Sequence, residues 1–323
     1  MQKITAWMLD GKGGGLPLSV DEAAQAPVPE GGFLWVHSLQ TFDEDRTWLT
    51  ALGGDPFVVA ALMADETRPR CTLHEGGVLM NLRGVNLNPG AEPEDMVSLR
   101  IWAGANKIVT LTRRPILALD DIEARGRTGN APASVAEMIA QVALRLADRA
   151  EPVVAELNEQ IDDLEDDVAA GTGTSQRSAL SNIRRVSIML RRYMFPQRDA
   201  LSTLEIEALP WVSTIQRAAL REATERVTRL AEELDAIRDR AQVVHDHLID
   251  LRAEAMNRQM LVLSVVTAVF LPLGLITGLL GINVGGIPGE STPHAFWIVS
   301  ALLLGIGAVQ MWVFARMGWL RRG

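Results

Sequence analysis

The stretch that decides the fold runs from Met260 to Leu280, MLVLSVVTAVFLPLGLITGLL, and is followed by Gly281-Ile282-Asn283. It has no charged side chain, and its polar groups are the hydroxyls of one serine and two threonines. A helix of roughly twenty residues, rising about 1.5 Å per residue, matches the roughly 30 Å hydrocarbon core of a bilayer. A buried core helix is the alternative, but uncharged runs above about eighteen residues favour a membrane span. We therefore predict that this segment crosses a membrane.

A second apolar run, Phe296 to Ala315, follows after a short loop and predicts a second span that forms an antiparallel hairpin with the first. The loop from Val284 to Ala295 has no lysine or arginine. Basic residues favour the cytoplasmic side, so both termini are expected there and the loop outside. The arginines that flank the two spans are Arg252, Arg258, Arg316, Arg321 and Arg322.

The totals of the chain limit its function. It has 323 residues and a formal net charge of −9, and this acidic balance argues against nucleic acid as a partner. Its single cysteine, Cys71, excludes an internal disulfide and fits a reducing compartment. The first residues lack a basic flank before an apolar core, so no signal peptide is expected. Because we find no nucleophile elbow, P-loop or HExxH motif, we do not expect an enzyme.

The first part of the chain alternates short strand-like and helical stretches, which predicts a mixed α/β domain. A helix is expected from Thr41 or Asp43 to Leu52, and Asp55-Pro56 should open another. A turn near Gly104 should divide the last strand region in two. The expected strand regions are Lys3–Leu9, Phe33–Val36, Val78–Leu87 and Met96–Thr112.

From Ser134 onward the pattern is almost continuously helical, and Ser134 with Glu137 fits a capping box. An acidic arm, Glu151–Asp167, a glycine turn at 171–174 and an arginine-rich arm predict an antiparallel helical hairpin with complementary charge. The alternative is two solvated faces with weak surface pairing. Pro196 and Pro210 are expected to break helices, and one helix should then run from about Val212 into the first span.

Together these features resemble the CorA-type metal-ion transporters, and the resemblance covers the whole chain. Its most specific motif is Gly281-Ile282-Asn283. The magnesium branch usually has methionine in the middle position, whereas isoleucine followed by Val284 to Gly289 is similar to the ZntB zinc-transporter branch. Further matches are Tyr193–Asp199 at an expected helix break, Met256-Asn257, Leu271-Pro272 and the basic end Trp319–Arg322. The resemblance implies a homopentamer in a bacterial inner membrane, in which the first span of every subunit lines the pore.

The expected fold is therefore an α+β membrane protein with a cytoplasmic α/β domain, a stalk helix continuous with the first span, and a two-span hairpin. The predicted divisions are 1–133 for the α/β domain, 134–259 for the long helices, 260–283 for the first span, 284–295 for the outer loop, 296–316 for the second span and 317–323 for a basic cytoplasmic tail.

One stripe of the first span carries small and polar groups at helical spacing, and we predict that it lines the pore. Close helix packing is the alternative use of such residues. The stripe offers no cysteine, histidine or carboxylate, which are the ligands of Zn²⁺ without its water, so the ion is expected to pass largely hydrated. Leu271 and Met260 are candidates for apolar constrictions. The stripe comprises Asn257, Met260, Ser264, Thr267, Leu271, Gly274 and Gly278, with the signature Gly281, Ile282 and Asn283 at its end.

Other polar groups are weaker candidates. Glu290 and His294 of the outer loop would attract cations as a ring of copies, unless they belong to an ordinary exposed loop. His247 and Asp250 share one helix face and form a candidate metal site with His245, which points differently, so the site improves only between neighbouring copies. Cys71-x-x-His74 fits a packed thiol and a surface imidazole better than a metal site.

The leading interpretation is a pentameric divalent-cation transporter, with zinc as the first expected ion, that needs no cofactor and has the bilayer, divalent cations and its own copies as partners. Zinc bound in the cytoplasmic domain is a further expectation. The alternatives are a magnesium, cobalt or nickel channel, and a membrane-anchored sensor or scaffold that does not conduct. Proton coupling would need loop or cytoplasmic groups, because neither span contains a carboxylate.

Overall fold

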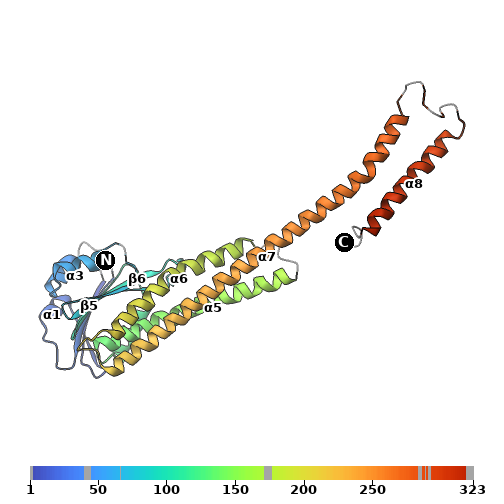
Figure 1. Cartoon of the computed structure of the whole chain (residues 1–323). Coiled ribbons are helices and arrows are strands. Elements are labelled where there is room, and N and C mark those ends of the chain that lie inside the picture. The colour runs from blue at the N-terminus through green and yellow to red at the C-terminus, as the bar shows by residue number, and fades with distance from the viewer. Residues whose placement is uncertain are drawn as a thin grey trace. The chain divides into compact units, whose positions relative to one another are not determined.

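The structure is a computed structural model that describes residues 3–39, 45–65, 67–170, 177–282, 286–287, 289 and 292–317. It divides into two compact units, Met1–His245 and Asp246–Gly323. The first unit contains a β-sheet with helices on both faces, and the second contains the end of one long helix and a final helix (Figure 1). The chain is thus a mixed α/β protein with a long helix and a C-terminal helix, as predicted.

The sheet has seven strands in the order β2-β1-β3-β7-β6-β5-β4. All neighbours are antiparallel except β3 and β7, which are parallel. The four predicted strand regions are confirmed, although β3 continues to Leu39 and β5 ends at Gly84. The edge strand β2 was not predicted, since its sequence Gly-Leu-Pro-Leu has no β-branched residue. The strands are β1 (Lys3–Leu9), β2 (Gly15–Leu18), β3 (Phe33–Leu39), β4 (Arg70–His74), β5 (Gly77–Gly84), β6 (Val97–Ala103) and β7 (Lys107–Thr112).

One face of the sheet is covered by three short helices, α1 (Val20–Gln25), α2 (Asp45–Ala51) and α3 (Pro56–Met63). Their apolar residues form a buried cluster with alternate residues of β3, such as Leu34 and Val36, because successive side chains of a strand point to opposite faces. Asp55 caps α3, as predicted, by accepting a hydrogen bond from the main-chain N–H of Val58 at 2.8 Å. The predicted start of α2 at Thr41 or Asp43 lies outside the described residues.

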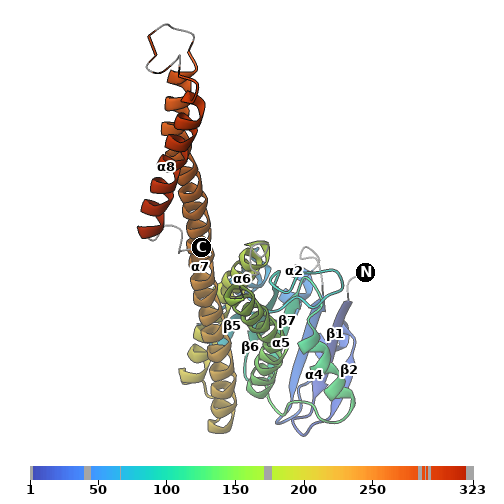
Figure 2. The ribbon, with the colours of Figure 1, turned by 90° about the vertical axis from the view of Figure 1, so that its right-hand side faces the viewer.

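The other face is covered by α4 (Leu117–Arg127), α5 (Val135–Ala169) and α6 (Arg177–Ile206) (Figure 2). Ser134 caps α5 by accepting a hydrogen bond from the N–H of Glu137 at 3.2 Å. The second half of the predicted capping box is different, because the Glu137 carboxylate accepts from the N–H of Ala133 at 2.9 Å rather than from Ser134. The predicted glycine turn at 171–174 lies outside the described residues.

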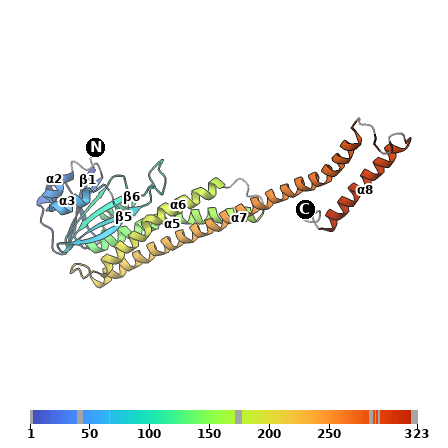
Figure 3. The ribbon, with the colours of Figure 1, turned by 45° about the horizontal axis from the view of Figure 1, so that its top comes forward.

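The prediction that Pro196 breaks a helix is wrong, because Pro196 lies inside α6, and the ribbon of α6 runs without a break (Figure 3). A proline in a helix removes one main-chain hydrogen bond, but packing on the sheet can outweigh this loss. Buried residues lie on both sides of the proline, among them Met194 and Leu201. The buried Gln197 also accepts a hydrogen bond from the main-chain N–H of Arg83 in β5 at 2.6 Å. Pro210, by contrast, lies between α6 and the next helix, α7 (Thr214–Leu280), as predicted.

The helices α5 and α6 form the predicted hairpin, but the acidic arm is not neutralised as expected. Asp162 and Glu165 of α5 both form ion pairs with Arg240, which belongs to the next helix of the chain. On the basic arm, Arg191 pairs with Asp235 of that same helix. The complementary charge therefore involves a third helix that the sequence pattern did not include.

This third helix, α7 (Thr214–Leu280), is a single helix of 67 residues with Pro272 inside it, which confirms the predicted long helix. The final helix, α8 (Ala295–Arg316), has 22 residues. Both contain a window long and apolar enough to cross a membrane, and neither window is buried within the chain. The two candidate membrane helices agree with the two predicted spans.

Candidate transport pathway

The seven residues predicted to line the pore all lie on α7, and all are exposed in the single chain. The most exposed large side chain among them is Leu271, at 72%. The less exposed residues of the same segment recur every three to four positions on a different side of the helix. These half-buried residues are Leu261, Val265, Val269, Pro272, Leu273 and Ile276.

Helix α8 lies alongside the membrane segment of α7 (Figures 1 and 2). Its own half-buried positions, which include Leu303, Ile306 and Gln310, also recur at helical spacing. Gln310 reaches across and donates from Nε2 to the main-chain oxygen of Ala268 at 3.3 Å. Because α8 covers the apolar side of α7, the polar stripe remains free for other partners.

The hydroxyls of this segment are partly satisfied within the helix. Thr267 donates from Oγ1 to the main-chain oxygen of Leu263 at 2.8 Å, and Thr277 donates to that of Leu273 at 3.0 Å. Each hydroxyl oxygen keeps its lone pairs as acceptors after donating. Such an oxygen can accept a hydrogen bond from the water shell of a cation, which is the chemistry that the stripe offers.

The signature at the end of the first span is only partly described. The main-chain N–H of Gly281 donates to the oxygen of Thr277 at 2.9 Å and so completes the last turn of the helix, and Ile282 is exposed. Asn283 and Glu290 lie outside the described residues. His294 precedes α8 as its N-cap residue, is exposed, and makes no side-chain capping hydrogen bond. The roles predicted for these residues stay predictions.

Within the described parts of the chain, one group of three side chains has ligand atoms close enough for a metal ion, and it is Asp55, His74 and Glu75. Their ligand atoms lie within 4.8 Å of one another, and His74 Nε2 is 2.5 Å from Asp55 Oδ2. The hydrogen bond from His74 is the main reason why the pKa of Asp55 is lowered. Sequence reasoning missed this group because Asp55 is separated from the other two residues by α3. The set His245, His247 and Asp250 is not such a group within one chain, and its use between copies stays a prediction.

Cys71 does not belong to this group. Cys71 and His74 are three residues apart on β4, and residues at an odd spacing point to opposite faces of a strand. Burial, with a smaller effect of Glu207, raises the pKa of the Cys71 thiol to about 12. A metal ligand must be the thiolate, so the pair Cys71-x-x-His74 is a poor metal site.

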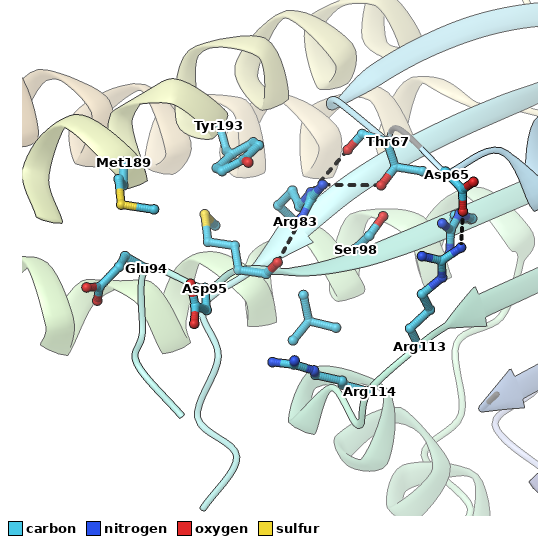
Figure 4. A pocket seen from close by; sticks show the side chains of 13 residues that line it. Asp65, Thr67, Arg83, Glu94, Asp95, Ser98, Arg113, Arg114, Met189 and Tyr193 are labelled. Atoms are coloured by element: carbon cyan, nitrogen blue, oxygen red, sulfur yellow. Dashed lines mark hydrogen bonds and ion pairs between the residues drawn. The ribbon is translucent and has the colours of Figure 1, made fainter. Parts of the chain in front are cut away.

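A cavity of about 410 Å³ in the sheet domain has four arginines and three acidic residues among its thirteen lining residues. Arg83 donates to the main-chain oxygens of Thr67 and Met96 at 3.1 and 2.7 Å, and its guanidinium lies 4.6 Å from the centre of the Tyr193 ring (Figure 4). Arg113 binds Asp65 at 2.6 Å. Burial and the neighbouring Arg113 and Arg83 lower the pKa of Arg100 to about 10. The contacts of Arg83 in this cavity join the loop at Thr67, the residue before β6 and α6 to the sheet.

The family model described as "CorA-like Mg2+ transporter protein" matches residues 30–316. The chain belongs to this family. The CorA-like family is one of transporters rather than enzymes, and the two apolar helices fit a membrane protein.

Individual relatives of this CorA-family chain agree with that assignment. It is 39% identical to the divalent cation transporter CmaX of Pseudomonas aeruginosa, over 98% of this chain and 96% of the relative. It is 36% identical to the zinc transport protein ZntB of Pectobacterium carotovorum, with the same coverage. The structure of full-length CmaX matches 98% of this chain and 97% of its own with a TM-score of 0.84 and 38% identity. The CorA magnesium transporter of Methanocaldococcus jannaschii, at 19% identity, shares the fold with a TM-score of 0.82 over 99% of this chain.

Proposed function

We propose that the chain forms a homopentameric transporter of divalent cations, zinc in the first place, in a bacterial inner membrane with both termini in the cytoplasm. The observation that carries the proposal is the stripe on α7, which carries small and polar groups, is exposed and lies away from the side that α8 covers. Two helices cannot enclose an aqueous path, so several copies must place this stripe around a common axis. The names of the relatives CmaX and ZntB support divalent cations and zinc as the substrate class.

The chemistry of the stripe supports a largely hydrated ion. Hydroxyl and amide oxygens at Asn257, Ser264 and Thr267 suit the outer water shell of the ion, whereas bare Zn²⁺ prefers nitrogen and sulfur ligands or carboxylates. A ring of Asn283 would replace part of this shell at the mouth, and Glu290 and His294 would attract cations to it. Exposed Leu271 and Met260 would form apolar rings that close the path by dewetting. Proton coupling in this proposal uses groups outside the spans.

Flux through proteoliposomes tests the proposal. The full chain should take up radioactive zinc down its gradient, and Asn283→Ala should lower the flux strongly while Asn88→Ala, a change in the sheet domain, should not. Faster uptake of magnesium than of zinc would favour the magnesium channel instead. A monomer in mild detergent without flux would favour the non-conducting anchor and sink the proposal.

We also infer that zinc binds in the cytoplasmic domain at Asp55, His74 and Glu75. One imidazole and two carboxylates are ligands that zinc accepts. Glu75 has a φ of 48°, a left-handed conformation that glycine adopts freely, so Glu75→Gly removes a ligand and leaves the turn intact. Asp55→Asn likewise keeps an N-cap residue. Calorimetric titration of the full chain with zinc should show one site fewer in either variant and no change in Glu92→Gln. Equal stoichiometry in all proteins would refute this site without touching the proposed transport.

A further inference from the structure

Pro272 leaves one carbonyl of the pore-lining helix without its usual donor. In an α-helix the oxygen of residue i accepts from the N–H of residue i+4, so the oxygen of Ala268 would accept from residue 272. Proline has no N–H, and α7 continues through Pro272 to Leu280. In hydrocarbon no water replaces the missing donor, so a proline in a membrane helix is tolerated where a neighbouring group supplies one.

The nearby hydroxyls of α7 do not supply this donor. Thr267 donates to Leu263, and Thr277 donates to Leu273 and Gly274. The donor that reaches Ala268 comes instead from the other helix, since Gln310 Nε2 lies 3.3 Å from the Ala268 oxygen.

Gln310 is itself unusual, because it places an amide in the middle of an apolar helix. Its Oε1 is buried and has no hydrogen-bond partner among the described residues. The bond to Ala268 therefore compensates the NH₂ group of this side chain for its burial. The NH₂ group of Gln310 and the unpaired carbonyl of Ala268, each unfavourable alone in hydrocarbon, satisfy one another.

We propose that Gln310 is a positioning residue of the transport path, which replaces the main-chain donor missing at Pro272 and so fixes α8 to the proline turn of α7. This inference rests on the proposed function for its consequence, because Leu271 and Gly274 of the stripe flank that turn. Any bend of α7 at Pro272 then requires α8 to follow, and the width of the path at Leu271 depends on a residue that does not face it.

A double-mutant cycle tests the contact. Gln310→Met keeps the length of the side chain and removes the amide, whereas Pro272→Ala restores a main-chain N–H for Ala268. In the full chain, Gln310→Met should shift the unfolding equilibrium about threefold toward the unfolded state, the size typical of an interhelical hydrogen bond in a membrane. In the Pro272→Ala background the same change should have almost no effect on that equilibrium. Ser300→Ala, which removes another half-buried polar group of α8, serves as the control and should behave alike in both backgrounds.

Transport measurements separate positioning from simple stabilisation. Gln310→Met should lower the maximal flux of correctly assembled protein and leave the half-saturating ion concentration unchanged, because Gln310 does not touch the ion. An equal effect of Gln310→Met in both backgrounds, or an unchanged flux, would overturn the proposal. If the wild-type chain does not transport at all, the proposed function fails, while the unfolding cycle still decides whether Gln310 serves the proline-freed carbonyl.

Discussion

Arg240 of α7 binds Glu165 of α5 through two parallel hydrogen bonds, from Nε to Oε1 at 2.9 Å and from Nη2 to Oε2 at 2.6 Å. Arg240 also binds Asp162 and donates from Nη1 to Asn158 Oδ1 at 3.1 Å. The two carboxylates raise the pKa of Arg240, with Glu165 as the larger cause. We call these contacts of the Arg240 guanidinium with Glu165, Asp162 and Asn158 the fork. The fork joins the acidic arm of α5 to α7 within the first unit.

Replacing Arg240 should weaken the first unit measurably. Arg240→Met keeps the aliphatic stem but loses the fork, and we expect a loss of about 1 kcal/mol, since partly exposed ion pairs contribute little individually. For a unit of this size, such a loss lowers the Tm by roughly 2–4 °C. Arg238→Met is the matched control, because Arg238 forms its ion pairs, among the residues that the structure describes, with Asp235 and Asp239 of its own helix, and it should change little. Near 1 M salt the difference between the variants should shrink; an equal loss in both variants would contradict the role of the fork.

The thiol of Cys71 should react slowly in the folded chain. Its pKa is raised from 9.0 to about 12, so at pH 8 the thiolate fraction is about a thousandfold lower than that of an ordinary cysteine. Alkylation by iodoacetamide, followed by mass spectrometry, should therefore be far slower in native protein than in urea. Because the chain has a single cysteine, the label reports this site alone. Rapid native alkylation would show that the strand opens readily.

Asp10 should make the N-terminal loop sensitive to acid. Its Oδ1 accepts hydrogen bonds from the main-chain N–H groups of Lys12 at 2.7 Å and Gly14 at 2.8 Å, and these bonds, Lys12 first, hold the pKa of Asp10 below its ordinary 3.8. A carboxylate with a lowered pKa stabilises the fold above its unfolded pKa, and this contribution is lost as the pH falls through the folded pKa. Asp10→Asn should thus lower the Tm at neutral pH, and the difference from wild type should begin to shrink near pH 3.8 and disappear once the pH is below the lowered pKa of folded Asp10. Melting curves of both proteins from pH 7 downward measure this Tm difference. A difference that stays the same at every pH would contradict the role of Asp10.

The structure of the loop at Asp10 explains why residues 13–15 are all glycines. No Gly-Lys-Ser/Thr follows these glycines at the spacing of a phosphate-binding motif, so their sequence alone indicates only a loop. In the structure Gly13 has a φ of 103°, and a Cβ on Gly14 would lie 2.4 Å from the Asp10 carboxylate. The glycines therefore allow the main chain to fold closely around the Asp10 carboxylate. The sequence alone does not show that these residues lie so close together.

The sequence by itself determined the two membrane helices, the single long helix α7 and most of the sheet, because each depends on a local pattern: an uncharged run, the absence of breakers, or alternation over several residues. It also identified the stripe on α7, since helical spacing alone decides which side chains share a face. Only the tertiary structure decided that Pro196 lies within a helix, that Arg240 forms ion pairs with the acidic arm of α5, and that Gln310 donates a hydrogen bond to Ala268. In each of these the deciding energy comes from residues far apart in the chain, and no local pattern records which of them meet.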